Sequence, residues 1–279
     1  MLYITETDLQ NFRAYLAELE RSEATISKYL HDARVLMEFA PEGIAGKAQL
    51  IEFRRFLEAK NLCASSINSI FGAVNQLLAF LGSDWKLRYI KVQRPTYLPA
   101  DRELTREEYE NLVNAAKAKG NLRLELLVQT LCSIGLRVSE LRFITVESLR
   151  NGVAEISNKG KNRMIQIPGA MANKLLPYCV ERGIQSGPVF ITRSGKPMDR
   201  SNIWKMLKKL AEAAKVLATK VFPHNLRHLF ARTHYKMFNN LAGLADLLGH
   251  SSINTTRIYT ATSGKEERRQ LDQLRLVLG

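Results

Sequence analysis

The chain has 279 residues, of which 46% are hydrophobic and 24% charged, a composition typical of a soluble globular protein with room for two modest domains. Lysine and arginine number 41 against 27 acidic residues, and the net charge of +14 favours a polyanionic partner such as DNA or RNA. No apolar run approaches the roughly 20 residues of a membrane span, and the acidic N-terminus is unlike a signal peptide. We therefore expect no membrane contact and a cytoplasmic, nucleoid-associated protein.

Apolar residues recur at helical spacing through the first 80 residues, with polar capping residues between the apolar stretches. The connections are short, so the pattern predicts a compact four-helix domain over residues 1–92. The expected helices run from Thr7 or Asp8 to Leu19, from Ser22 or Thr25 to Phe39, over 47–59, and over 65–80.

Two prolines, Pro95 and Pro99, interrupt a largely polar stretch after the helical domain. Proline lacks the amide donor of a helix and biases the residue before it away from helix, so residues 93–104 are predicted to form an extended linker. A second domain is expected over residues 105–264, followed by a C-terminal tail helix over 265–279.

The second domain is predicted to be mainly helical with one small β-hairpin, which makes it a mixed α+β domain. Its first helix begins with a capping box, and the turn of the hairpin is rich in asparagine and glycine. The expected elements are helices over 106–118, 121–134 and 200–214, strands over 153–157 and 163–167, and a helical stretch from 226 to the end that is broken at Gly249.

Four histidines, His224, His228, His234 and His250, lie within 27 positions, and two of them bracket Arg227. Histidine transfers protons near neutral pH, whereas arginine offers a fixed, permanently charged fork of donors that fits a phosphate. His224 and Arg227 share one face if a helix begins there. A metal site is the alternative, but the histidines lack the carboxylate of an HExxH motif, so we expect neither metal nor cofactor.

Two further motifs place polar residues beside helix-ending glycines. In the first, GLRVSEL, Arg137 follows Gly135; a surface ion pair with Glu140 is the simpler interpretation of that arginine taken alone. In the second, LGHSSINTTRIYT, Gly249 ends one helix, Ser251 or Ser252 caps the next, and Tyr259 follows His250 by about two turns. By composition alone, this tyrosine is a half-buried packing residue.

Together GLRVSEL, the hairpin, HNLRH and LGHSSINTTRIYT resemble, in this order, the tyrosine recombinases of the phage integrase family, and the Xer group in particular. The resemblance covers residues from about 104 to 262, and the helical N-terminal domain resembles the core-binding domain of that family in size and helix pattern. It implies an enzyme that cleaves and rejoins DNA strands through a covalent 3′-phosphotyrosine, without metal or ATP. A tyrosine phenol is a weak nucleophile at neutral pH. Its attack therefore needs nearby groups that stabilise the charge growing on the phosphate, and two arginines, a lysine and two histidines would supply them.

The resemblance also assigns roles to individual residues. Tyr259, nine residues after a histidine, corresponds to the nucleophile, and the two arginines grip the scissile phosphate. Lys159 corresponds to the hairpin lysine that protonates the leaving 5′ oxygen, although Lys161 remains an alternative because the turn reads NKGKN. The catalytic residues that the resemblance implies are Arg137, Lys159, His224, Arg227, His250 and Tyr259. Glu140 and His228 are expected to support the site without reacting.

The expected partner is double-stranded DNA with paired recombination sites, bound by a homo-tetramer; without DNA a monomer is one of the states that the sequence leaves open. Leu271, Leu274 and Leu278 form an apolar stripe on the tail that would link the protomers. Residues expected to contact DNA are Lys161, Arg163, Lys205, Lys208 and Lys209, although a solvated basic face also explains the last three.

Three other functions compete with recombination: relaxation of supercoils by a type IB topoisomerase, DNA binding without chemistry, and a helical interaction module. The sequence identifies neither the DNA target nor whether the chain resolves chromosome dimers or integrates a phage or transposon. The short region before the first helix favours a Xer-like or mobile-element enzyme.

Overall fold

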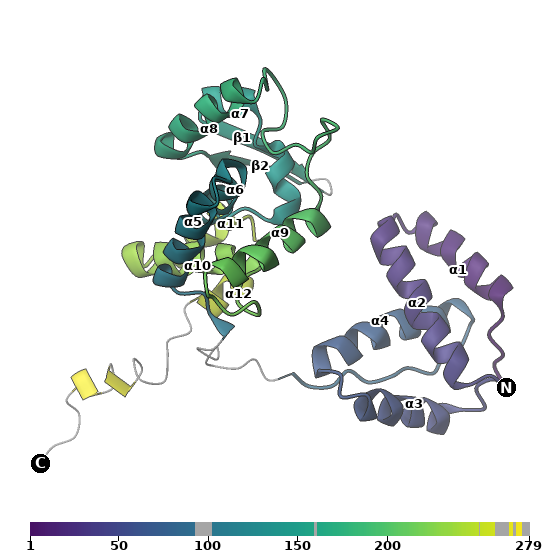
Figure 1. Cartoon of the computed structure of the whole chain (residues 1–279). Coiled ribbons are helices and arrows are strands. Elements are labelled where there is room, and N and C mark those ends of the chain that lie inside the picture. The colour runs from purple at the N-terminus through teal and green to yellow at the C-terminus, as the bar shows by residue number, and fades with distance from the viewer. Residues whose placement is uncertain (93–101, 159–160, 251, 260–267, 270–271, 275–279) are drawn as a thin grey trace, which may run out of the picture. The chain divides into compact units, whose positions relative to one another are not determined.

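The computed structural model describes residues 1–92, 102–158, 161–250, 252–259, 268–269 and 272–274. It divides into two compact units, Met1–Arg94 and Pro95–Gly279, each treated by itself below (Figure 1). The predicted linker, the tip of the hairpin and most of the predicted tail helix lie outside the described residues. Within the described parts of the chain, no helix is long and apolar enough to cross a membrane.

The N-terminal unit contains four helices: α1 (Glu6–Glu18), α2 (Glu23–Phe39), α3 (Lys47–Ala59) and α4 (Ala64–Phe80). The prediction that Thr7 or Asp8 caps α1 is wrong, since Thr5 accepts the amide of Asp8 and the Asp8 carboxylate accepts the amide of Thr5. Such a reciprocal capping box requires a hydroxyl residue followed by an acid three positions later. Of the two predicted candidates, Ser22 and Thr25, it is Ser22 that caps α2.

The core of this unit consists of apolar side chains that recur on one face of each helix, including the fully buried Phe12, Phe53 and Phe71. Two asparagines on α4 secure the segment that follows the helix. The amide of Asn75 exchanges two hydrogen bonds with the backbone of Leu87, at 2.7 and 2.9 Å. Asn68 does the same with Ile90. The chain therefore leaves the four-helix unit along α4 in a defined position.

The C-terminal unit is mainly helical with one antiparallel hairpin, in which Val153 pairs with Gln166. Its largest core consists of apolar side chains of α5 through α10 and of the hairpin. The elements, in chain order, are α5 (Arg106–Ala118), α6 (Leu122–Ile134), the 3-10 helix η2 (Val138–Phe143), α7 (Val146–Asn151), β1 (Val153–Asn158), β2 (Lys161–Gln166), α8 (Gly169–Glu181), α9 (Arg200–Ala213), α10 (Pro223–Phe238), α11 (Leu241–Leu248), α12 (Ile253–Thr256) and the 3-10 helix η3 (Arg257–Tyr259).

The structure confirms the predicted fold class and most element positions, and it departs from the prediction at three places. The sequence patterns did not indicate α7 or α8. The helical stretch after residue 226 has a second break, because Asn239 adopts a left-handed backbone with φ +50° and Asn240 then caps α11. Asparagine tolerates left-handed backbone and accepts amide hydrogen bonds, so an Asn-Asn pair ends one helix and starts the next.

Candidate active site

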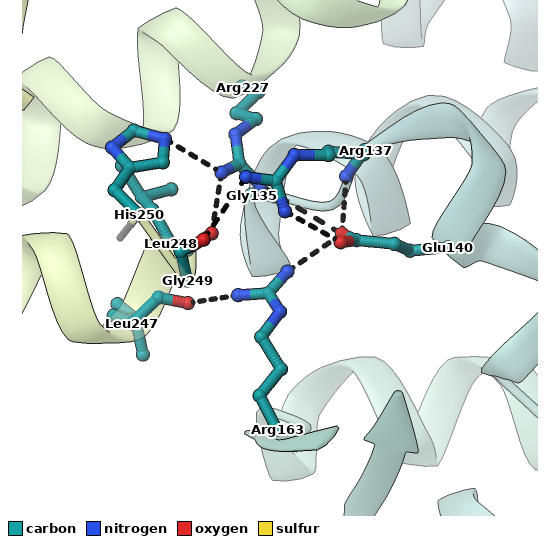
Figure 2. Close-up of polar contacts among 9 residues, drawn as sticks. All are labelled: Gly135, Arg137, Glu140, Arg163, Arg227, Leu247, Leu248, Gly249 and His250. Carbon is teal, nitrogen blue, oxygen red and sulfur yellow. Dashed lines mark hydrogen bonds and ion pairs between the residues drawn. The ribbon is translucent and has the colours of Figure 1, made fainter. Parts of the chain in front are cut away.

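Three segments far apart in sequence meet at the candidate site: the start of η2, the first turns of α10, and the end of α11 with His250 after it (Figure 2). Gly135 and Gly249 make this meeting possible. Each ends a helix in left-handed backbone, at φ +68° and +63°, and each leaves its carbonyl oxygen facing an arginine. The two helix ends therefore position arginines rather than merely ending helices.

Glu140 lies at the centre of the site, with only 1% of its surface exposed. One carboxylate oxygen accepts the backbone amide of Arg137 at 2.8 Å and the Arg163 guanidinium at 2.7 Å. The other accepts Nη1 of Arg137 at 2.8 Å. A buried carboxylate is costly unless opposite charges surround it, so Glu140 and its arginines stabilise one another.

Arg227 is fully buried. Its Nη1 donates to the carbonyl oxygen of Gly135, and its Nη2 to that of Leu248, both at 2.6 Å. Its Nη2 also lies 3.1 Å from Nε2 of His250, whereas its Nε finds no hydrogen-bond partner among the described residues. Burial lowers the pKa of Arg227 to about 10, with a further contribution from Arg137, so the guanidinium stays charged at neutral pH.

His250 connects Arg227 to the segment that carries the tyrosine. Its Nδ1 lies 2.8 Å from Oγ1 of Thr256, which is fully buried. Burial, followed by the nearby charge of Arg227, lowers the pKa of His250 to about 4. The imidazole is therefore neutral at physiological pH.

Tyr259 is 3% exposed and packs against Ala231, Leu244 and Leu248. The ring of His228 meets it edge-on, with 5.0 Å between centroids, and the ring of His250 stacks at 6.2 Å. Burial raises the pKa of the phenol, an effect that the charge of Arg227 partly offsets. The side chain is thus adjacent to the arginines but covered by protein.

A pocket of about 360 Å³ opens beside these groups, lined among others by Arg137, Ser139, Arg200, Trp204 and His224. The α10 helix begins there with Pro223, and no side chain caps it within the described part of the chain. Partial desolvation of the ring lowers the pKa of the exposed His224, and Arg227 and Arg137 lower it further. An uncapped helix start beside arginines is suited to a phosphate.

The structure brings Arg137, Glu140, Arg227, His250 and Tyr259 together. His224 lines the adjoining pocket, and His228 contacts the tyrosine ring. Lys159, and the side chain of its alternative Lys161, lie outside the described residues.

The five predicted DNA contacts separate into different environments. Arg163 faces inward, because its side chain is 17% exposed and donates to Glu140 and, at 2.8 Å, to the carbonyl oxygen of Leu247. Lys208 bonds to the carbonyl oxygen of Ala218 and lies over the Trp204 ring. The other two lysines on α9, Lys205 and Lys209, are exposed.

Sequence reasoning missed Thr256 and Arg200. The position of Thr256 six residues after His250 carried no chemical pattern of its own. The described residues include no group of three or more histidine, cysteine, aspartate or glutamate side chains placed to hold a metal ion.

A mainly helical unit that gathers three arginines about one buried glutamate, with a histidine and a tyrosine beside one of these arginines, defines the class of enzymes that cleave and rejoin DNA strands. The chain belongs to the phage integrase family, whose sequence pattern matches residues 102–266, and it is a tyrosine recombinase, an enzyme of site-specific DNA recombination.

Similar proteins span nearly the whole chain. A tyrosine recombinase XerA of Pyrococcus furiosus is 29% identical over 278 residues, which cover 96% of this chain and 94% of the relative. A tyrosine recombinase XerD of Vibrio cholerae is 29% identical over 262 residues, 86% of each chain. Both extend into the N-terminal helical unit.

Among solved structures, a lambda integrase dimer bound to a COC′ core site matches with a TM-score of 0.74 at 18% identity, covering 94% of this chain and 96% of that one. A XerH recombinase bound to its palindromic difH substrate after cleavage matches with a TM-score of 0.70 at 20% identity, covering 88% and 78%. At these identities the likeness concerns the fold.

Proposed function

We propose that Tyr259 is the nucleophile of strand cleavage and forms the 3′-phosphotyrosine bond of the recombination reaction. The phenol oxygen attacks the scissile phosphorus, a phosphotyrosine bond forms, and the 5′ oxygen of the next nucleotide leaves. A 5′ hydroxyl from another strand reverses the step and releases the tyrosine, so the energy of the diester is conserved without ATP. The position of Tyr259 beside Arg227 and two histidines is the observation that carries this proposal.

The scissile phosphate would occupy the pocket beside the start of α10. Arg137 has one guanidinium nitrogen held by Glu140 and another on the Gly249 carbonyl oxygen at 3.2 Å, a weaker bond that a phosphate oxygen would replace. Arg227 holds its place through two carbonyl oxygens and so offers a preorganised positive charge. Preorganised charge stabilises the transition state because little reorganisation remains to be done during the reaction.

The proton of the phenol needs a base that is unprotonated before the reaction, and the leaving oxygen needs an acid that still carries its proton. His224 lines the pocket, and burial together with Arg227 and Arg137 lowers the pKa of its ring, which favours the neutral form that can accept a proton. His250 donates a hydrogen bond to the phosphate, and the hairpin lysine, Lys159 with Lys161 as the alternative, protonates the leaving 5′ oxygen. His228 supports the tyrosine ring through its edge-on contact.

We assign Arg163 a positioning role in place of the expected DNA contact. Its guanidinium joins β2 to both Glu140 and the end of α11, so it sets the position of the hairpin relative to the phosphate site. On α9, the exposed Lys205 and Lys209 then make the direct contacts to DNA phosphates. Because each such contact releases a counterion from DNA, the affinity should fall steeply as salt is raised.

The substrate we propose is double-stranded DNA carrying paired sites, on which four copies of the chain act as a tetramer in the cytoplasm, at the nucleoid. An apolar pocket of about 300 Å³ supports a docking role for the C-terminal tail of a neighbouring protomer. The exposed Met237 and Phe238 line it, and two buried polar atoms at its wall, Ser133 Oγ and His234 Nδ1, have no partner among the described residues. Chains ending at residue 266 should cleave single sites but fail to sediment as tetramers on DNA.

The nucleophile is tested by trapping. A binding site is first selected from random-sequence duplexes by its affinity for this protein. A duplex with this site is then nicked next to the cleavage position and incubated with the full chain. The short fragment released by cleavage diffuses away, so the covalent complex accumulates. We expect the trapped complex from the natural chain and its loss from Tyr259→Phe, while a matched Tyr235→Phe variant, altered in a nearby ring of the same apolar cluster, retains it. A covalent complex formed by Tyr259→Phe would overturn the assignment.

A further inference from the structure

The hydrogen bonds of His250 determine which of its nitrogens carries the proton. Its Nε2 lies 3.1 Å from Nη2 of Arg227, and a guanidinium only donates. Nε2 must therefore accept and carry no proton. Because the pKa of His250 is lowered to about 4, the ring is neutral, so its one proton lies on Nδ1 and is donated to Oγ1 of Thr256.

This tautomer is the opposite of the one that the reaction requires. To donate a hydrogen bond to the phosphate, as proposed above, His250 needs a proton on Nε2. The neutral ring meets this requirement by exchanging tautomers: Nδ1 releases its proton to water and Nε2 takes one from water, with no net change in the charge of the ring or of the solvent. The incoming phosphate makes the exchange favourable, since it accepts from Arg227 and leaves Nε2 facing a phosphate oxygen.

Thr256 is suited to such an exchange because a hydroxyl both accepts and donates. Carboxylates and backbone carbonyls, the common partners of functional histidines, only accept, and so fix the proton on the nitrogen they face. The hydroxyl of Thr256 accepts from Nδ1 in the free protein and can turn to donate to it afterwards. As Thr256 is fully buried, water is a poor replacement, and an unpaired Nδ1 would be costly in either state.

We propose that Thr256 is a positioning residue that holds the His250 ring in place through both of its neutral tautomers and lets the ring change from accepting from Arg227 to donating to the phosphate. The change of tautomer on DNA binding rests on the proposed function, whereas the tautomer of the free protein does not. Thr256 itself touches no reacting atom.

The test combines two variants. Thr256→Ser keeps the hydroxyl, and Thr256→Val keeps the shape without it. On the nicked duplex we expect Thr256→Val to form the covalent complex about ten- to a hundredfold more slowly, and Thr256→Ser to stay within about threefold of the natural chain. Equal rates for Val and the natural chain, or equal losses in Val and Ser, would overturn the inference.

Imidazole nitrogen shifts in the full chain labelled with ¹⁵N-histidine report the tautomer directly, with His250 assigned by its absence in His250→Asn. We expect the proton on Nδ1 in the free protein and on Nε2 in Tyr259→Phe bound to the selected duplex. In the free Thr256→Val variant, the preference for Nδ1 should be lost. One tautomer in both states would refute the exchange even if trapping had established the nucleophile. Conversely, a failed trapping experiment would leave the result for the free protein standing.

Discussion

Replacing Gly135 by alanine tests how tightly the site is assembled. The residue adopts φ +68°, which costs a non-glycine residue about 1–2 kcal/mol. An added Cβ would also lie 2.4 Å from Cδ1 of the Phe230 ring, far inside van der Waals contact. Overpacking of this kind costs about 1–3 kcal/mol, so we expect Gly135→Ala to lose about 2–5 kcal/mol of the free energy of unfolding.

Gly152→Ala provides the matched control. This glycine also ends a helix in left-handed backbone, at φ +70°, but its added Cβ would meet no described atom within 4 Å. The control should therefore lose only about 1–2 kcal/mol of the free energy of unfolding, the cost of backbone strain. The difference between the two variants isolates the clash with Phe230.

Urea unfolding followed by fluorescence provides the measurement. The chain has two tryptophans, Trp85 in the N-terminal unit and Trp204 in the C-terminal unit, so a Trp85→Phe background lets Trp204 alone report on the unit that holds the site. A double variant with Phe230→Leu should recover part of the loss. Equal losses in Gly135→Ala and Gly152→Ala, or strict additivity with Phe230→Leu, would refute the steric reasoning.

Two further predictions concern the charged groups of the site. His228 and His250 have pKa values of about 4 in the folded chain, below the ordinary value near 6.5. The unfolded chain therefore binds protons first as pH falls from about 6.5 to 4. Urea titrations should show the free energy of unfolding falling over this range, by up to about 1.4 kcal/mol per pH unit from His228 and by less from the more exposed His250, and the fall should be smaller in His228→Gln. Arg163→Lys keeps the charge but cannot bond both Glu140 and Leu247, so cleavage should slow. Arg163→Gln also removes the charge, and the salt dependence of its DNA affinity should match that of the natural chain; a salt slope reduced by about 1 in Arg163→Gln would instead indicate a phosphate contact.

Much of the fold was predictable because its signals are local. Capping residues and helical spacing depend on neighbours in sequence, and Ser22 and Gly135 marked helix ends correctly. The break at Asn239 was missed because asparagine favours left-handed backbone only weakly, and a helix continues through it unless packing decides otherwise.

The candidate site was predictable in its members but not in its contacts. The motifs carry Arg137, Arg227 and His250 together with their types and order, and these residues do meet. Whether a basic side chain on a hairpin turns outward or inward depends on a carboxylate and a carbonyl oxygen from distant segments, so the inward position of Arg163 was not visible in the sequence. The burial of Tyr259 is likewise a tertiary property.

Glu140 is the shared carboxylate of three arginines, so the cluster carries a net positive charge. Three arginines, Arg137, Arg163 and Arg227, surround one carboxylate, which leaves these four side chains with a charge of 3 − 1 = +2. A DNA phosphodiester carries a single negative charge, and attack by a phenolate adds a second. The four side chains therefore keep an excess of +1 with the intact strand and become neutral only at the five-coordinate phosphorus, so this cluster matches the transition state in charge more closely than it matches bound DNA.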